Sequence, residues 1–338
     1  IYSSPDYLNG IKGQYKSRFG GKTEIAAVYA QANWQMSSQW DAAFGLRYEE
    51  FKSLRGYYDN DDAATLEFDL NHIPSEKKQA LSPKLSLGYR PAPMWLLRYS
   101  IAKAHRFPIV EELFSQYKAY NNVTFSNPEL EPEDGTHHNV MIDKSTNDGY
   151  FRVNLFHEVV DNAIESQTDS STNVRSFVPI DEVQVTGLEF IINQNNLLKN
   201  KLDLRFNVTW TDATIMDNSS AESGPNFDPS ESIKGHKYPR IPKWRGNLLA
   251  TYHLSDAWDL STSLQYASNS YGRIDNLDTI SHVYGAQDAY SRLGVKTAYQ
   301  LTEQWKLSFG IDNVTNKIAY VAHPWPGRTA YLNFAYSL

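Results

Sequence analysis

The chain has 338 residues, 13% of them aromatic, with no cysteine and a mean hydropathy of -0.54. No run approaches the ~18 to 20 apolar residues of a membrane-spanning helix, and the abundance of aromatic residues excludes low-complexity disorder. The net charge of -7 argues against a partner such as nucleic acid, and the absence of cysteine excludes disulfides and thiolate metal sites.

Apolar and polar residues alternate strictly in segments of about ten residues, which is the length of a tilted strand that crosses a bilayer. The segment 201–211 is the clearest, since Leu202, Leu204, Phe206, Val208 and Trp210 all fall on one face. In chain order the pattern predicts strands near 23–35, 40–52, 80–90, 94–105, 137–144, 150–160, 183–193, 201–214, 243–253, 258–268, 289–299, 305–312 and 328–338.

The connections between these strands are alternately short and long. The short ones lie at 36–39, 91–93, 145–149, 194–200, 255–257 and 301–304, and the long ones run roughly over 53–79, 106–136, 161–182, 215–242, 269–288 and 313–327. A soluble sandwich or propeller would also alternate, but short turns on one side and long loops on the other are typical of an outer-membrane barrel.

Tryptophan gives an independent signal. Five of the eight tryptophans lie beside the short turns: Trp34, Trp40, Trp95, Trp258 and Trp305. Indole rings collect at the membrane interface of a barrel, whereas a soluble sandwich would place them in mid-strand, in its core. The sequence therefore predicts an all-β fold, a transmembrane antiparallel β-barrel with a membrane-interface girdle at its short-turn end.

Thirteen predicted strands are an odd number, and closed single-chain bacterial barrels normally have an even one. Either residues 1–20, with GIKGQYKSRF as the candidate segment, add a fourteenth strand, or the chain is the end of a larger barrel. The first alternative would suit a passive porin-like or structural outer-membrane barrel.

Several sequence motifs resemble those of TonB-dependent outer-membrane receptors. They are AVYAQANWQMSSQWDAAFGLRYEEF from Ala27, WLLRYSIAKAHRFPIVEELF from Trp95, NPELEPEDG from Asn127, VTGLEF from Val185, RIPKWRGNLLATYHL from Arg240 and the closing segment GIDNVTNKIAYVAHPWPGRTAYLNFAYSL. Each motif is weak by itself. Together the six occur in the same order as in the family, and the resemblance extends over almost the whole chain.

The resemblance implies that residues 1–338 are part of one barrel domain, the last ~13 strands of about 22, without the N-terminal plug and first strands. It implies a receptor in the outer membrane of a Gram-negative bacterium that binds an iron chelate or similar metal complex and imports it in a TonB-energised step. The expected partners are the TonB complex, outer-membrane lipid or lipopolysaccharide, and the chelate itself, with no resident cofactor.

Aromatic and basic residues in the long loops are the candidates for binding an anionic chelate. They are Arg106, Tyr117, Tyr120, Phe125, Arg240, Tyr271, Arg273, Tyr284 and Trp325. The alternative for each is an ordinary loop residue, or an arginine fixed to a loop carboxylate.

Metal and enzyme motifs are weak. Convergence of His105, His137 and His323 on one metal is conceivable, and the acidic loop Asp59–Asp62, with Glu67 and Asp69, lacks the spacing of an EF-hand. The HExxH pattern fails because Asp161 follows Val160, and no Gly-x-Ser-x-Gly elbow occurs. We therefore expect neither a metal site nor an enzyme.

Overall fold

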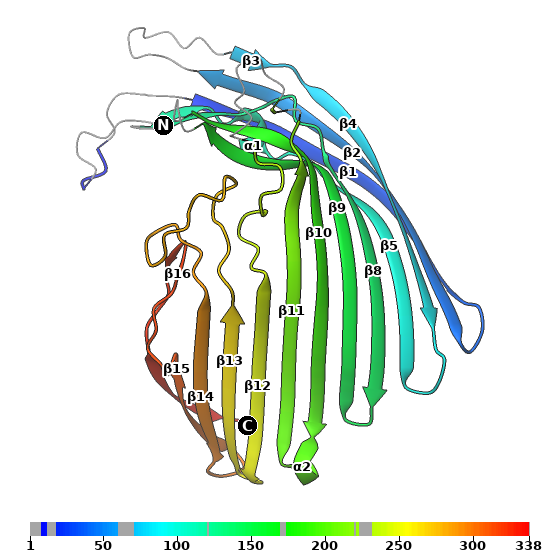
Figure 1. Cartoon of the computed structure of the whole chain (residues 1–338), viewed down its shortest axis with the longest axis vertical. Coiled ribbons are helices and arrows are strands. Elements are labelled where there is room, and N and C mark those ends of the chain that lie inside the picture. Colours follow the sequence, from blue (N-terminus) through cyan, green and yellow to red (C-terminus); the bar gives the residue numbers. More distant parts are fainter. Residues whose placement is uncertain are drawn as a thin grey trace.

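A computed structural model describes residues 8–11, 18–59, 71–119, 122–169, 174–219, 221–222 and 232–337. Thirteen strands follow one another in a single curved sheet, and every neighbouring pair along this path is antiparallel (Figure 1). They are β1 (Arg18–Gln35), β2 (Trp40–Asp59), β4 (Glu76–Tyr89), β5 (Trp95–Arg106), β8 (Glu133–Thr146), β9 (Gly149–Asp169), β10 (Val174–Asn196), β11 (Leu202–Asp217), β12 (Trp244–Ser255), β13 (Trp258–Ala267), β14 (Tyr290–Gln300), β15 (Trp305–Asp312) and β18 (Thr329–Tyr336).

All thirteen strands expected from alternation are confirmed, but several are longer than predicted. Strands β9 and β10 have 21 and 23 residues, and they pair with each other from Gly149↔Gln194 to Asp169↔Val174. The prediction that 161–182 is a loop is therefore wrong, since 161–169 and 174–182 are strand. The ladder continues because each added residue still finds a backbone partner on the neighbouring strand.

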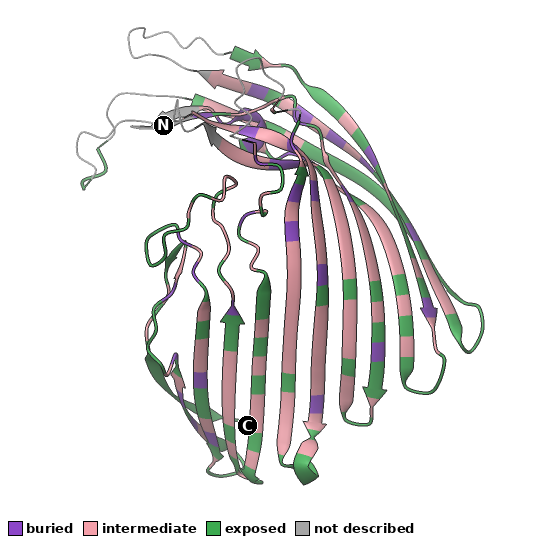
Figure 2. Cartoon of the chain, viewed as in Figure 1, coloured by how far each residue is buried: buried purple, intermediate pink, exposed green. Residues whose placement is uncertain are grey.

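The cross-strand register collects the apolar positions on one face of the sheet. Across five strands the pairs Phe44↔Leu85, Leu85↔Ile101, Leu97↔Ile142 and Val140↔Leu155 join apolar residues. This apolar face is exposed, with Phe44 at 52%, and exposed residues recur along β5, β8 and β12 in Figure 2. In water each large side chain would forgo roughly 1.5–3 kcal/mol of burial, so the face suits hydrocarbon.

The five predicted girdle residues lie at the short-turn end, each with more than a third of its surface exposed. Their rings are supported by aromatic neighbours, as where Trp40 stacks on Tyr89 with centroids 4.4 Å apart and Trp305 on Phe334 at 4.5 Å. Trp34, Trp40, Trp95, Trp258 and Trp305 thus lie along one edge of the apolar face, and their role as a membrane-interface girdle stays a prediction.

A second aromatic level, which the sequence analysis missed, lies near the other end of the strands. Trp210 and Trp244 are direct cross-strand partners, and Trp210 also pairs with Leu188. From Trp244 to Tyr252, which pairs with Leu260 near the first girdle, eight residues span about 27 Å along β12. At a strand tilt of about 40° the two levels are about 20 Å apart along the membrane normal, which is comparable with the ~25 Å apolar band of an outer-membrane barrel.

The predicted short connections are confirmed as tight turns. The turn after β10 contains α2 (Leu197–Asn200), in which Leu198, Lys199 and Asn200 have positive φ. The second helix is the one-turn α1 (Val110–Phe114). Neither helix in the described part of the chain has the length and apolar character to cross a membrane.

Strands β1 and β18 are the two ends of the strand path, so the sheet remains open within the described residues. Of the candidate fourteenth strand GIKGQYKSRF, Arg18 and Phe19 belong to β1 itself. Residues 12–17 lie outside the described residues.

The connection between β5 and β8 folds back against the inner face of the sheet, opposite the apolar face. Its helix α1 contacts β1 and β2, and Phe107 stacks on Phe51 with centroids 5.0 Å apart. Phe51, Phe107, Leu113 and Phe114 form a buried core with Leu130. The same connection contains β6 (Tyr117–Ala119) and β7 (Asn122–Phe125), and β7 pairs in parallel with β10.

The remaining short strands lie at the long-loop end. Strand β3 (Asn71–Ile73) pairs with the end of β2, and β16 (Tyr320–Val321) pairs with β17 (His323–Pro324) in a two-residue hairpin. Each of these pairings is local, between a connection and the strand before it or within one connection.

Candidate functional site

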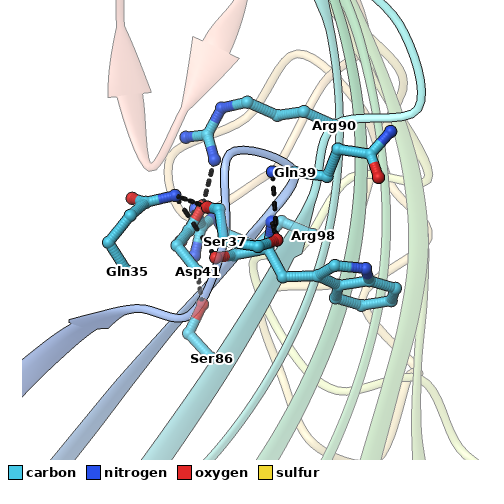
Figure 3. A network of polar contacts seen from close by, with 8 residues as sticks. Gln35, Ser37, Gln39, Asp41, Ser86, Arg90 and Arg98 are labelled. Atoms are coloured by element: carbon cyan, nitrogen blue, oxygen red, sulfur yellow. Dashed lines mark hydrogen bonds and ion pairs between the residues drawn. The ribbon is translucent and has the colours of Figure 1, made fainter.

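The inner face of the sheet carries the polar residues. The side chains expected to point inward lie opposite the apolar register: Arg47, Lys84, Arg98, Asp203, Arg205 and Lys306. Many inner charges are paired, as where Asp41 accepts hydrogen bonds from Arg90 and Arg98 (Figure 3) and Arg152 lies 2.6 Å from Asp143. Such paired charges suit a polar, water-filled or protein-filled interior.

Arg106, at the end of β5, is fixed to two carboxylates. Its guanidinium nitrogens lie 3.0 Å from Glu112 Oε1 and 2.6 Å from Glu133 Oε1. Glu112 also accepts the Ile109 N–H at 2.9 Å, and Glu133 accepts the Ile164 N–H at 2.8 Å. Arg106 therefore holds α1 and β9 to the end of β5, which agrees with the alternative of a structural arginine.

Three candidates belong to the connection that contains α1. Tyr117 lies in β6, and Tyr120 is outside the described residues. Phe125 ends β7 next to β10 and is 38% exposed. Of the three, Phe125 alone has a described side chain, and it is accessible at the edge of the inner loop.

Arg240, Tyr271 and Arg273 lie where two long loops meet. The Arg240 N–H donates to the Tyr271 carbonyl at 2.6 Å, and the Arg273 guanidinium pairs with Asp275. Asn276 strengthens the junction, because its side chain accepts the Lys237 N–H at 2.7 Å. Arg240 and Tyr271 thus join the two loops to each other, whereas Arg273 pairs within its own loop.

Tyr238 anchors the first of these loops to the sheet. Burial raises the pKa of its hydroxyl, and the carboxylate of Glu165, 3.4 Å away, raises that pKa further. The group therefore stays protonated at physiological pH, and it donates to a carboxylate at the end of β9.

Tyr284 and Trp325 lie at a second junction, between the loop that follows β13 and the loop that follows β15. Tyr284 is 73% exposed, and its ring contacts those of Tyr320 and His323 at 5.9 Å. Trp325 packs against Tyr290 with centroids 4.8 Å apart. The junction thus contains two separate aromatic contacts, Tyr284 with Tyr320 and His323, and Tyr290 with Trp325.

A groove of about 550 Å³ opens at this junction, beside the first residues of β14. We call it the loop-junction groove. Its lining is aromatic, aliphatic, basic and imidazole in character: Tyr266, His282, Tyr290, Arg292, Lys317, Ile318 and Trp325. The volume lies within the 300–1,000 Å³ of small-molecule sites, so the groove is large enough for a small ligand.

The buried Asp288 carboxylate holds this junction together. It accepts the His282 N–H at 3.1 Å and the Tyr320 N–H at 3.0 Å, and its side chain is 4% exposed. The Gly285 N–H and the Ala322 carbonyl join the same two loops at 2.8 Å. This role could not be predicted from the sequence, because a single aspartate in a predicted loop forms no recognisable pattern.

The histidines proposed to converge do not form a metal site. His105 contacts Ser82 and Asp134, His137 lies 3.4 Å from Glu158, and His323 contacts Tyr284. Within the described ranges, no group of three or more His, Cys, Asp or Glu residues can hold a metal ion. The acidic positions 60–62, Glu67 and Asp69 lie outside those ranges, as does the side chain of Asp59.

The chain is similar to known proteins over most of its length. The profile described as "TonB dependent receptor-like, beta-barrel" matches residues 2–314. The chain is 20% identical over 333 residues to a probable TonB-dependent siderophore receptor, PiuA of Acinetobacter baumannii. The aligned region covers 96% of this chain and 42% of the relative.

Solved structures share the fold. The crystal structure of PiuA superposes with a TM-score of 0.71 at 17% identity, covering 94% of this chain and 44% of that one. The copper transporter OprC gives 0.70 at 16% identity, covering 94% and 48%. The ferric-catecholate import receptor Fiu from E. coli gives 0.70 at 14% identity, covering 94% and 45%. The chain thus spans less than half the length of these relatives.

Proposed function

The chain belongs to the TonB-dependent receptor-like β-barrel family, and on that premise we propose that it forms the C-terminal part of an outer-membrane receptor. The receptor binds an iron chelate or a similar scarce metal complex at the extracellular face and imports it to the periplasm. The proposal includes a Gram-negative outer membrane as its location, and TonB, outer-membrane lipid or lipopolysaccharide, and the chelate as its partners.

The loop-junction groove carries this proposal. It lies at the long-loop end, above the second aromatic level, where a complex arriving from outside would first meet the protein. Aromatic rings and guanidinium or ammonium groups in one groove suit an anionic, ring-containing chelate. Tyr284 and Trp325 are the predicted candidates at this junction, and Arg240, Tyr271, Arg273 and Phe125 serve as additional contacts.

A part-barrel also accounts for the open sheet. Unpaired backbone groups in hydrocarbon cost several kcal/mol each, so the edges of β1 and β18 need partners. We propose that residues 1–338 are one partial barrel domain, and that further strands and a plug of the same protein complete it. The coverage of less than half of each relative supports this arrangement.

Uptake of radiolabelled iron tests the function. Cells that produce the full-length protein, and cells that lack it, are supplied with ferric 2,3-dihydroxybenzoate, ferric citrate or hemin, with and without a protonophore. We expect protein-dependent uptake of at least one complex, abolished by the protonophore and by loss of TonB. Energy-independent leakage of unrelated solutes, with ion conductance in planar bilayers, would instead establish the passive porin-like barrel.

A further inference from the structure

Two histidines lie side by side on the apolar face of the sheet. His138 of β8 and His157 of β9 are direct cross-strand partners, and the next pair on the same face is Val140↔Leu155. Residues opposite each other in an antiparallel pair have Cβ atoms roughly 4.5–5.5 Å apart. The two imidazoles can therefore reach one ion together, whereas His137, next in sequence, points to the inner face.

The pair lies just outside the apolar band. His157 also pairs with Thr186 of β10, and Thr186 lies two residues, about 7 Å, beyond Leu188 at the Trp210 level. At this height the outer surface of a barrel meets lipid headgroups and water instead of acyl chains. Both histidines are half-buried, so an ion from the aqueous phase can reach them.

A hydroxyl group from a neighbouring strand orients each imidazole. His138 Nδ1 lies 2.8 Å from the Tyr99 hydroxyl of β5, and His157 Nδ1 lies 2.8 Å from Thr186 Oγ1 of β10. Strands β5 and β10 flank the β8–β9 pair on opposite sides (Figure 1). The two nitrogens of an imidazole lie on opposite sides of the ring, so an Nδ1 directed away from the other histidine turns its own Nε2 toward that histidine. The two Nε2 atoms therefore converge over the space between β8 and β9.

This arrangement suits a first-row transition metal. Neutral imidazole nitrogen binds zinc, at about 2.0–2.1 Å, and copper(II). A histidine that ligates a metal usually donates its other ring N–H to an oxygen acceptor, which fixes the tautomer. The hydroxyl oxygens of Tyr99 and Thr186 are such acceptors, one for each ring. Within the described residues neither Nε2 has a hydrogen-bond partner, so both nitrogens are available to an ion.

We propose that His138 and His157 bind one divalent transition-metal ion, zinc or copper(II), through their two Nε2 atoms on the outer surface of the barrel. Two protein ligands leave the remaining positions of the ion to water. The ion joins β8 to β9 and is resident, not imported, because a ligand on the lipid-facing side has no path through the sheet to the interior. The site is thus independent of the proposed receptor function.

Calorimetric titration with zinc tests the site, using the full-length protein extracted from outer membranes in detergent and freed of metal with a chelator. The parent should bind one equivalent more than His138→Ala or His157→Ala. The double variant should lose no more than either single variant, because the two ligands share one ion. His137→Ala, on the inner face, is the matched control and should retain the equivalent. With copper(II), the electron paramagnetic resonance of this equivalent should show two nitrogen ligands in the parent.

The orienting hydroxyl groups give a second measurement. Tyr99→Phe and Thr186→Val should each weaken zinc binding about tenfold without abolishing it, because each removes a hydrogen bond to a ligand and not the ligand itself. Zinc should raise the melting temperature of the parent and of His137→Ala, but not of His138→Ala or His157→Ala, because an ion that binds only the folded state stabilises it.

An unchanged number of zinc equivalents in His138→Ala and His157→Ala overturns the site, as does a loss in only one of them. Metal-free melting temperatures equal to that of the parent exclude misfolding as the reason for a loss. If the histidine variants do not fold, unchanged zinc affinity in both Tyr99→Phe and Thr186→Val overturns the site instead. Energy-dependent uptake of an iron complex by the parent tests the receptor function and not this site, so either can fail alone.

Discussion

Asp41 and Arg98 form a 2.6 Å ion pair although their strands, β2 and β5, are not neighbours. Strand β4 lies between them, and the residue at the crossing point is Gly88, which pairs with Asp41 on one side and Arg98 on the other. A Cβ on Gly88 would lie 2.6 Å from Arg98 Nη2 and 2.7 Å from Asp41 Oδ2. The absence of a side chain on the middle strand therefore allows the bridge seen in Figure 3.

Gly88→Ala should separate this pair and lower the free energy of unfolding by about 1–2 kcal/mol, because a charge-assisted hydrogen bond is lost. Asp41→Asn should cost a similar amount, and the double variant less than the sum of the two. Ser86→Ala removes a neutral acceptor of Arg98, 2.9 Å away, and should cost less. Urea titration in lipid vesicles measures the free energy of unfolding of these four variants and of the parent protein. If the costs of Gly88→Ala and Asp41→Asn simply add in the double variant, Gly88 acts independently of the ion pair.

The sequence predicts the strands well because one side of a transmembrane strand faces lipid and the other faces the polar interior. Alternation along 201–211 encodes a lipid face and an inner face without reference to any other part of the chain. The same signal fails at the ends of β9 and β10. Above the second aromatic level, side chains of these strands such as Ile164, Phe177 and Ile180 pack against loop residues and not against lipid, so the alternation is lost although the pairing continues.

The site was less predictable because its contacts come from loops distant in sequence. The predicted candidate Trp325 does line the groove, since aromatic residues in loops are a compositional signal, whereas Tyr284 contacts Tyr320 and His323 outside its lining. The sequence did not predict a role for His282, Asp288 or Arg292, because that role depends on one loop folding against another. Arg106 was a plausible ligand contact by residue type, and tertiary structure fixes it between Glu112 and Glu133 instead.

The register makes a direct prediction about the lipid face. Phe206 pairs with Ile192 and Leu248 on the apolar face, and its neighbour Asn207 lines the inner face. Phe206→Lys should cost about 2–4 kcal/mol near the bilayer midplane, whereas Asn207→Lys should be nearly neutral. Unfolding in lipid vesicles distinguishes them. Equal costs at the two positions would contradict the assignment of the two faces.

A second glycine position controls the inner loop. The Phe114 ring is 1% exposed and lies against Gly21 and Gly56, where a Cβ on Gly56 would come 2.4 Å from its Cε1. Gly56→Ala should therefore displace α1 and speed limited proteolysis between residues 107 and 132. Phe114→Ala should cost about 3–5 kcal/mol through the cavity it leaves.

In the Phe114→Ala background, Gly56→Ala should have little further effect on proteolysis, because the ring with which the added Cβ would clash is absent. Proteolysis patterns of the four proteins complete the cycle. A full additional effect of Gly56→Ala without the ring would mean that Ile73, whose Cβ lies 2.9 Å from the added carbon, is the affected contact.

Strands β8 to β11 place four carboxylates in one cross-strand row, Asp134↔Asp161, Asp161↔Glu182 and Glu182↔Asp217. Glu182 lies six residues, about 20 Å, beyond Leu188 at the Trp210 level, so the row lies outside the membrane band. Lys103 lies 2.6 Å from Asp134 and Lys234 3.7 Å from Asp217, which leaves the middle of the row without a cation among these contacts. Partial burial raises the pKa of Asp161, and Glu182 and Asp134 raise it further.

Asp161→Asn should therefore stabilise the protein at neutral pH by a few tenths to about 1 kcal/mol, because it removes a like charge between two others. With a folded-state pKa above the unfolded value, wild-type Asp161 destabilises when ionised and ceases to do so as the pH falls through that folded-state pKa. The advantage of the variant should thus shrink on acidification and vanish below about pH 4. Melting temperatures across this pH range measure it, with Asp256→Asn in the short turn after β12 as control. A difference independent of pH would show that the substitution acts through packing rather than charge.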